Sequence, residues 1–135
     1  LERELERALF LLHKAHRVSH HLEAIEKAKS LKGGRYLILE DSMSLPQDLD
    51  QFDFHLMHFF RWKAEEWGLL LFDKNDCESI RSEHPHFLEV TKVFSPKMYV
   101  VSQMFLDPLY AHYMKGESLD TLEINPEMAV FCSPT

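Results

Sequence analysis

Three carboxylates stand directly after apolar runs, at positions where a buried strand would end. Glu40 and Asp41 follow the run over residues 36–39, and Asp73 follows the run over residues 69–72. If both runs are strands that point the same way, these side chains emerge at one edge of the sheet, where ligands of parallel sheets bind. Carboxylate oxygens there suit Mg²⁺, which often also binds phosphate. Acids after strands are also ordinary turn and cap residues, so a turn explains them nearly as well.

Histidines form a second group with ligand chemistry. His16, His20 and Glu23 are spaced so that they share one helix face, where imidazole and carboxylate could hold a transition metal. Nothing nearby completes a closed ligand set, so histidines along the solvated edge of a helix are the stronger interpretation. His55 and His58 lie three residues apart in another predicted helix, with no matching third ligand. The sequence therefore predicts no bound metal and no other cofactor.

Motifs of the common enzyme classes do not occur. Four glycines leave no phosphate-binding loop, and the sequence contains neither a Gly-x-Ser-x-Gly elbow nor a His-Glu-x-x-His pair. The two cysteines, Cys77 and Cys132, are too few and too far apart for a disulfide framework. A reducing, cytoplasmic compartment and a chain that is not an enzyme are the expectation.

The elements that would position these residues centre on residues 35–74. Residues 35–40 are apolar throughout their middle, as in a strand buried on both faces. Ser44 is a suitable N-cap for an amphipathic helix over residues 45–67, and a second buried strand follows at residues 69–73. This order predicts a βαβ unit, and with it a small three-layer α/β domain whose sheet is mostly parallel.

Residues 1–31 are predicted to form one long helix that stops at the following Gly-Gly pair. Its apolar residues recur at intervals of three and four, which is typical of a coiled-coil seam and also of a helix lying on its own domain's sheet. Both interpretations stay open. On the first, a homodimer would form through Leu5, Leu12 and Leu22. The chain is accordingly divided into an N-terminal helix, residues 1–32, and an α/β domain, residues 33–135.

The rest of the α/β domain is expected to alternate short helices and strands. Residues 87–94 fit either a helix or a strand. The other expected elements are a helix over residues 75–81, a strand over 98–101, a helix over 107–116, a strand over 119–124 and a helical turn over 126–131.

The helix over residues 45–67 carries more aromatic side chains than one buried face can use. Phe54, Trp62 and part of the Phe59-Phe60 pair cannot all face the same core, and His58 lies on the same helix. Aromatic side chains left on a surface are typical of a partner-binding face. The predicted contact with another protein is therefore Phe54, His58 and Trp62.

Composition limits the class of partner. The chain has 135 residues, 45% of them hydrophobic, which is enough for one domain with a real core. Its net charge of −7 combines about +3 over residues 1–35 with about −10 over residues 36–135, so an acidic body argues against nucleic acid. Apolar runs of about five residues are too short to span a membrane. A start at Leu1 without a visible signal peptide leads us to expect a fragment of a longer protein.

At the level of fold, the order of segments resembles the receiver domain of response regulators. That family has an acidic pair after its first strand, as in residues 36–41, and a Ser or Thr after its fourth, as at Ser102. Asn125 and Pro126 stand where the family has Lys-Pro, and residues 87–94 contain no Asp to accept phosphate. The resemblance thus implies a receiver-like chain that is not phosphorylated, and likeness of fold carries no function by itself.

These observations favour a non-catalytic regulatory or protein-interaction domain of a larger cytosolic protein, involved in signalling. It would dimerise through its N-terminal helix and bind a protein partner on the aromatic helix. The alternative is a Mg²⁺-dependent enzyme that acts on a phosphorylated or nucleotide substrate through Glu40, Asp41 and Asp73.

Overall fold

The computed structural model describes residues 9–12, 17–31, 33–40, 47–63 and 66–133, with side chains described from residue 20 onward. In this part of the chain, seven strands form one sheet in the order β1-β2-β6-β3-β7-β5-β4. The strands are β1 Leu9–Leu12, β2 Arg35–Glu40, β3 Leu69–Leu71, β4 Cys77–Arg81, β5 Leu88–Val93, β6 Met98–Ser102 and β7 Val130–Cys132. The helices are α2 Arg17–Lys29, α3 Leu49–Trp62 and α4 Leu106–Met114, with short 3-10 turns η1 Lys74–Asp76, η2 Gln103–Phe105, η3 Leu119–Thr121 and η4 Pro126–Met128.

Most neighbouring strands are antiparallel, so the predicted mostly parallel sheet is wrong. β6 runs antiparallel to β2 and to β3, and β5 runs antiparallel to β7 and to β4. The described parallel pairs are β1 with β2 and β3 with β7. The two apolar runs do form buried strands that point the same way, but they are not neighbours. An apolar run typical of burial on both faces indicates a strand but does not indicate which strand it pairs with. Here β6 lies between β2 and β3.

The N-terminal region also differs from the prediction, because there is no long helix over residues 1–31. Leu9–Leu12 form the edge strand β1, which pairs in parallel with β2 from Leu37 to Glu40, and α2 has only 13 residues. The apolar residues of this region fit helical spacing. Helix propensity is a weak effect, however, and pairing with the edge of β2 outweighs it. Of the predicted dimer residues, Leu5 lies outside the described residues and Leu12 belongs to β1. Leu22 is half-buried and packs against the core of its own domain.

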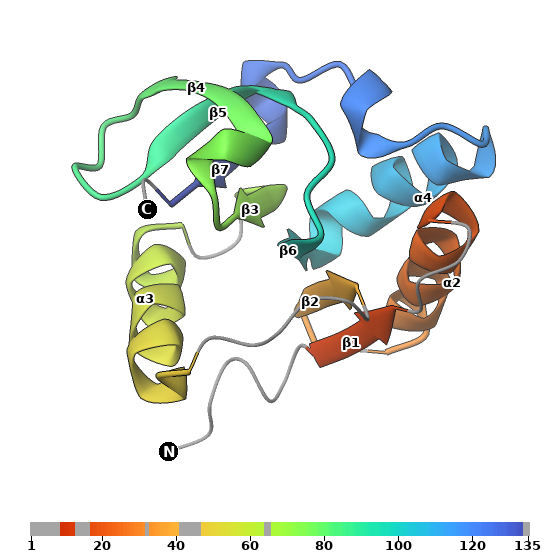
Figure 1. Ribbon diagram of the computed structural model, residues 1–135, viewed down its shortest axis with the longest axis horizontal. Coiled ribbons are helices and arrows are strands. Elements are labelled where there is room, and N and C mark those ends of the chain that lie inside the picture. The colour runs from red at the N-terminus through yellow and green to blue at the C-terminus, as the bar shows by residue number, and fades with distance from the viewer. Residues whose placement is uncertain (1–8, 13–16, 32, 41–46, 64–65, 134–135) are drawn as a thin grey trace.

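Helices cover both faces of the sheet, and alternation along each strand separates two cores (Figure 1). On one face, α2 and α4 lie side by side and pack on Ile38 and Tyr99. On the other face, α3 packs on Leu37, Leu70 and Val100. Successive strand residues point to opposite faces, so neighbours such as Leu37 and Ile38 belong to different cores.

The helix α3 is shorter than predicted at both ends. Its N-cap is Asp48, whose carboxylate accepts a hydrogen bond from the Gln51 N–H at 2.9 Å, whereas Ser44 lies outside the described residues. The helix ends at Trp62, and Trp67 reaches the same core from the following segment. Gly68 then lets the chain approach closely, since a Cβ atom there would lie 2.5 Å from the Met128 carbonyl oxygen.

Two predictions in the second half of the chain are wrong. The predicted helix over residues 75–81 is mostly strand β4, and the predicted strand over 119–124 contains η3. The helical turn predicted over 126–131 does form as η4, but it ends at Met128 and the chain continues into strand β7. The ambiguous residues 87–94 contain strand β5. In β4, β5 and β7 the pairing between strands, which local pattern does not show, decides the conformation.

Candidate functional site

A cavity of about 720 Å³ opens beside α3 at one end of the sheet. Ligand sites typically measure ~300–1,000 Å³, so this volume suits a small organic molecule. Its walls come from α3, from the ends of β3 and β7, from the start of β6 and from the segment before β5. The lining residues are Asp48, Gln51, Phe52, Phe54, His55, His58, Phe72, His86, Phe87, Met98 and Ser133.

The cavity lies at the carboxyl ends of the strands that run in the same direction. Phe72 directly follows β3, and Ser133 directly follows β7. The end of β2 reaches the same edge, because the Glu40 N–H donates to the Lys97 carbonyl oxygen at 2.9 Å. Sheets with parallel strands commonly bind ligands outside these ends, where the backbone turns away and leaves a crevice.

Aromatic rings form much of the cavity wall. Phe52 packs on Phe72 with ring centroids 5.0 Å apart, and His55 packs on Phe87 at 5.0 Å. Phe54 is 57% exposed, although its ring makes an edge-on contact with the His58 imidazole. Such surfaces favour a flat ring, because stacked and edge-on aromatic pairs add about 0.5–1.5 kcal/mol beyond area burial.

His55 provides a polar atom inside this apolar wall. Its Nε2 atom is buried and has no hydrogen-bond partner among the described residues. Burial lowers the pKa of His55, and the nearby charges of His58 and His86 lower it further. The imidazole is therefore neutral at pH 7, where each ring nitrogen either donates or accepts one hydrogen bond.

We expect His55 to make the stability of the protein fall in acid. Because the folded state lowers its pKa, the unfolded chain binds the proton more readily, and the free energy of unfolding is greatest above pH 6.5. That stability is lost progressively as the pH falls from 6.5 through the lower folded pKa. Urea denaturation at pH 7.5 and pH 5 should show a smaller loss for His55→Gln than for the wild type. The control is His20→Gln, on α2 and outside the cavity, and an unchanged loss in His55→Gln would refute the assignment.

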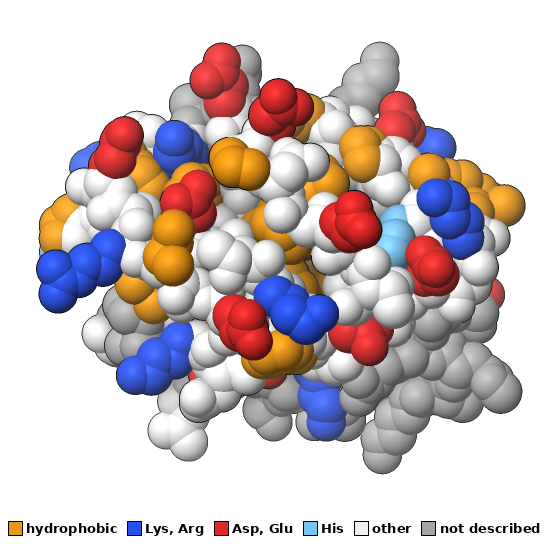
Figure 2. Space-filling view, turned by 90° about the horizontal axis from the view of Figure 1, so that it is seen from above, with side chains coloured by type: hydrophobic (Ala, Val, Ile, Leu, Met, Phe, Trp, Pro, Cys, Tyr) orange, Lys and Arg blue, Asp and Glu red, His pale blue; other side chains and the backbone are white. Residues whose placement is uncertain are grey.

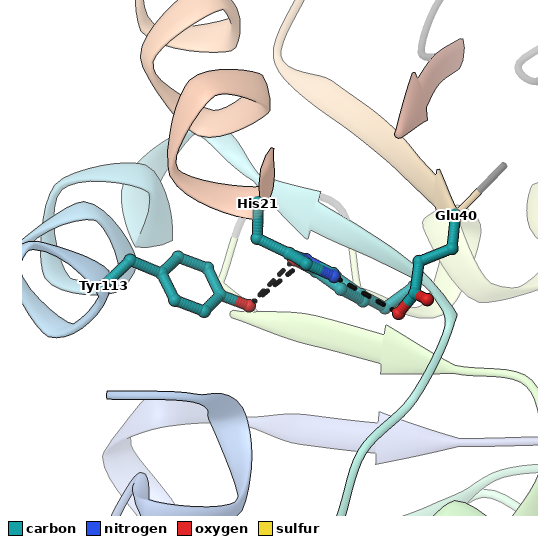
Figure 3. Close-up of polar contacts among 4 residues, drawn as sticks. His21, Glu40 and Tyr113 are labelled. Atoms are coloured by element: carbon teal, nitrogen blue, oxygen red, sulfur yellow. Dashed lines mark hydrogen bonds and ion pairs between the residues drawn. The ribbon is translucent and has the colours of Figure 1, made fainter. Parts of the chain in front are cut away.

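A set of polar side chains that contact one another lies inside the other core, between α2, β2, β6 and α4 (Figure 3). His21 Nδ1 is 2.7 Å from the Tyr99 hydroxyl, and His21 Nε2 is 3.4 Å from Glu40 Oε2. The Tyr99 hydroxyl is 3.0 Å from that of Tyr113, which is itself 3.4 Å from His21 Nδ1. All four side chains are buried. We refer to His21, Glu40, Tyr99 and Tyr113 as the buried network.

Protonated phenols complete the buried network. Burial raises the pKa of Tyr99 well above its usual value, with a further rise from the neighbouring Tyr113, and burial likewise raises the pKa of Tyr113. Both hydroxyls thus keep their protons at neutral pH and serve as donors. Since Glu40 contacts His21, its carboxylate lies on the α2 side of the sheet, whereas the cavity lies on the α3 side.

The structure does not gather the predicted strand-end acids. Glu40 belongs to the buried network, and Asp73 caps η1 by accepting a hydrogen bond from the Asn75 N–H at 2.8 Å. Asp41 lies outside the described residues. Because β6 separates β2 from β3, the two strand ends are about 10 Å apart. Within the described ranges, no three His, Cys, Asp or Glu side chains come together to hold a metal ion.

The other predicted ligands are also spread out. His16 lies outside the described residues, His20 is half-buried on α2, and Glu23 is exposed. The cysteines lie close together despite their separation in sequence, with Cys77 Sγ and Cys132 Sγ 3.5 Å apart as free, buried thiols. Burial raises the pKa of Cys77 to about 12, so its thiol stays protonated at neutral pH.

Two of the three predicted partner-binding residues line the cavity. Phe54 and His58 do so, whereas Trp62 stacks on Phe87 at 5.9 Å and is half-buried. Sequence reasoning missed the wall formed by His86 and Phe87. The one local signal was the pair of histidines around a proline at residues 84–86, which indicates a fixed turn but not what it faces.

Comparison with protein-family models, with curated proteins and with solved structures gives no match for this chain. None of the described helices combines the length and the apolar character needed to cross a membrane. On the face shown in Figure 2, acidic and basic side chains are interspersed.

Proposed function

We propose that this chain is a non-catalytic binding domain that takes a small organic molecule with a flat ring into the cavity beside α3. The observation that carries this proposal is the cavity itself, with phenyl rings on its walls and the buried, unpaired Nε2 atom of His55 among them. Apolar pockets with a few polar groups are the usual form of a small-molecule site.

The ring would lie among Phe52, Phe54, Phe72 and Phe87. These side chains come from α3 and from two separate loops, so an intervening ring would contact several elements at once. His55 would accept or donate one hydrogen bond and so fix the orientation of the ring. The proposed ligand is smaller than the protein partner expected from the sequence. One of the three residues predicted to contact that partner, Trp62, packs instead on Phe87 and Phe131.

The placement of the strand-end acids supports a binding role rather than catalysis. The enzyme alternative needs carboxylates that converge, but Glu40 contacts His21 and Asp73 caps η1. A regulatory role in a larger cytoplasmic protein agrees with free thiols at Cys77 and Cys132, since disulfides are rare in that compartment.

Truncation of Phe54 is expected to weaken binding of a flat-ring probe. With the neutral compound 2-naphthalenesulfonamide, calorimetric titration of Phe54→Ala should give an affinity roughly 2- to 12-fold below wild type, the equivalent of about 0.5–1.5 kcal/mol. Phe94→Ala removes another exposed phenyl ring that does not line the cavity, and it should keep the wild-type affinity. Equal losses in both variants, or NMR shift changes remote from α3 on titration, would refute the proposed site.

A further inference from the structure

Three imidazoles line the cavity, and a fourth packs against one of them. His55 and His58 come from α3, whereas His84 and His86 come from the turn between β4 and β5. The rings of His84 and His86 have centroids 5.6 Å apart. Burial lowers the pKa of both His55 and His84, and the neighbouring His58 and His86 lower it further. These four residues are here called the histidine end.

The four residues of the histidine end have different roles. The His84 ring packs on Trp62 at 4.8 Å and on Phe87 at 5.0 Å, and its Nδ1 atom accepts the His86 N–H at 3.0 Å. It therefore acts mainly as a support for the turn. His58 and His86 are exposed and line the cavity, so they are placed to contact a ligand.

The carboxylate in the cavity wall lies away from the histidine end. Asp48 is the carboxylate among the described lining residues, and no described lining residue is Lys or Arg. Asp48 precedes His58 by ten residues, which is about 15 Å along a helix axis. The charged residues nearest to these histidines in sequence are Asp53 and Arg61 on α3 and Glu83 in the turn. Asp53 and Glu83 are carboxylates and Arg61 is a constant cation, so a change of charge near pH 6.5 belongs to the imidazoles.

We propose that the ligand of this cavity is an aromatic anion, whose ring lies among the phenyl side chains and whose acidic group is bound by His58 and His86. This inference rests on the proposed function and specifies its ligand. Protonated imidazoles at the histidine end repel one another, and a bound anion relieves that repulsion. Binding of the anion is therefore stronger in acid, as the imidazoles acquire protons.

A matched pair of probes tests the inference. 2-Naphthalenesulfonate keeps one negative charge between pH 5.5 and pH 8, whereas 2-naphthalenesulfonamide has the same ring and is neutral over that range. Calorimetric titration of the wild-type protein should give a sulfonate affinity at least 5-fold higher at pH 5.5 than at pH 8, and a sulfonamide affinity that changes less than 2-fold. Circular dichroism at both pH values confirms that the protein is folded.

Variants identify the imidazoles responsible. His58→Gln combined with His86→Gln should abolish the pH dependence for the sulfonate and leave the sulfonamide affinity within 2-fold of wild type. The matched control is His20→Gln, since His20 lies on α2 and does not line the cavity. If the double variant does not fold, the single His58→Gln variant should show a reduced pH dependence.

The outcomes separate the two proposals. Sulfonamide binding without a tighter, pH-dependent sulfonate refutes the aromatic anion and leaves the proposed function standing. Failure of both probes to bind refutes both. Sulfonate binding that keeps its pH dependence in the double variant refutes the assignment to His58 and His86.

Discussion

Replacement of His21 by Leu is expected to lower the free energy of unfolding by about 3 kcal/mol or more at pH 7, because it leaves a buried carboxylate without its imidazole partner. Glu40 is 5% exposed and His21 is 4% exposed, so water cannot easily replace the lost contact. The change also removes the acceptor or donor that lies 2.7 Å from the Tyr99 hydroxyl. The Tyr99 hydroxyl keeps its contact with the Tyr113 hydroxyl at 3.0 Å, so the lost hydrogen bond adds about 0.5–1.5 kcal/mol.

Denaturation by urea measures this effect, and a second substitution tests its cause. Glu40→Gln removes the charge but keeps a polar group, so on the His21→Leu background it should restore part of the lost stability. Glu23→Gln makes the same change at an exposed position of α2 and should alter the free energy of unfolding by less than about 0.5 kcal/mol. A loss below 1 kcal/mol in His21→Leu would show that the buried network does not stabilise the fold.

The sequence predicted individual strands better than their arrangement. The strand over residues 35–40 is confirmed as β2, and the run after Gly68 is confirmed as β3. Both were recognisable because a run of apolar residues ending at an acid is a local signal. The arrangement was wrong because β6, some 60 residues beyond β2 in the chain, inserts between them through backbone hydrogen bonds. Such pairing depends on backbone groups that every sequence shares, so side-chain pattern does not reveal it.

The N-terminal error has a different physical origin. Residues 1–31 contain good helix formers and no Gly or Pro, and α2 does form over part of that stretch. The spacing of apolar side chains does not show that β2 needs a second neighbour on the side away from β6. Leu9–Leu12 supply a strand for that edge, and the backbone groups of β2 are thereby hydrogen-bonded.

The candidate site was predictable on one wall only. A surplus of aromatic side chains on one helix pointed to Phe54 and His58, which do line the cavity. The opposite wall comes from the turn before β5, and the buried network joins His21 to Tyr99 across 78 residues. Neither has a spacing that a linear sequence could reveal, because both depend on which strands become neighbours.

Replacement of Phe59 by Ala is the second change with a large expected effect, a loss of about 3–5 kcal/mol in the free energy of unfolding. Phe59 is fully buried on the inner face of α3, where it joins the helix to three separate parts of the chain. Its ring has centroids 5.1 Å from Trp67, 5.1 Å from Phe87 and 5.8 Å from Phe131. Truncation would leave a void that close-packed aromatic neighbours cannot fill, and it would withdraw support from Phe87 in the cavity wall.

The same helix provides a control that separates packing from recognition. Phe54→Ala truncates the same side chain at a position that is 57% exposed, and it should lower the free energy of unfolding by less than about 1 kcal/mol. Phe59→Ala should therefore lose stability. Phe54→Ala should keep its stability but bind the naphthalene probes more weakly. If Phe59→Ala were as stable as Phe54→Ala, α3 would not pack on the sheet through this ring, and the inner wall of the cavity would have to be built differently. A large effect of Phe59→Ala on stability, with a small one for Phe54→Ala, would instead establish that one face of α3 holds the fold and the other is available to a ligand.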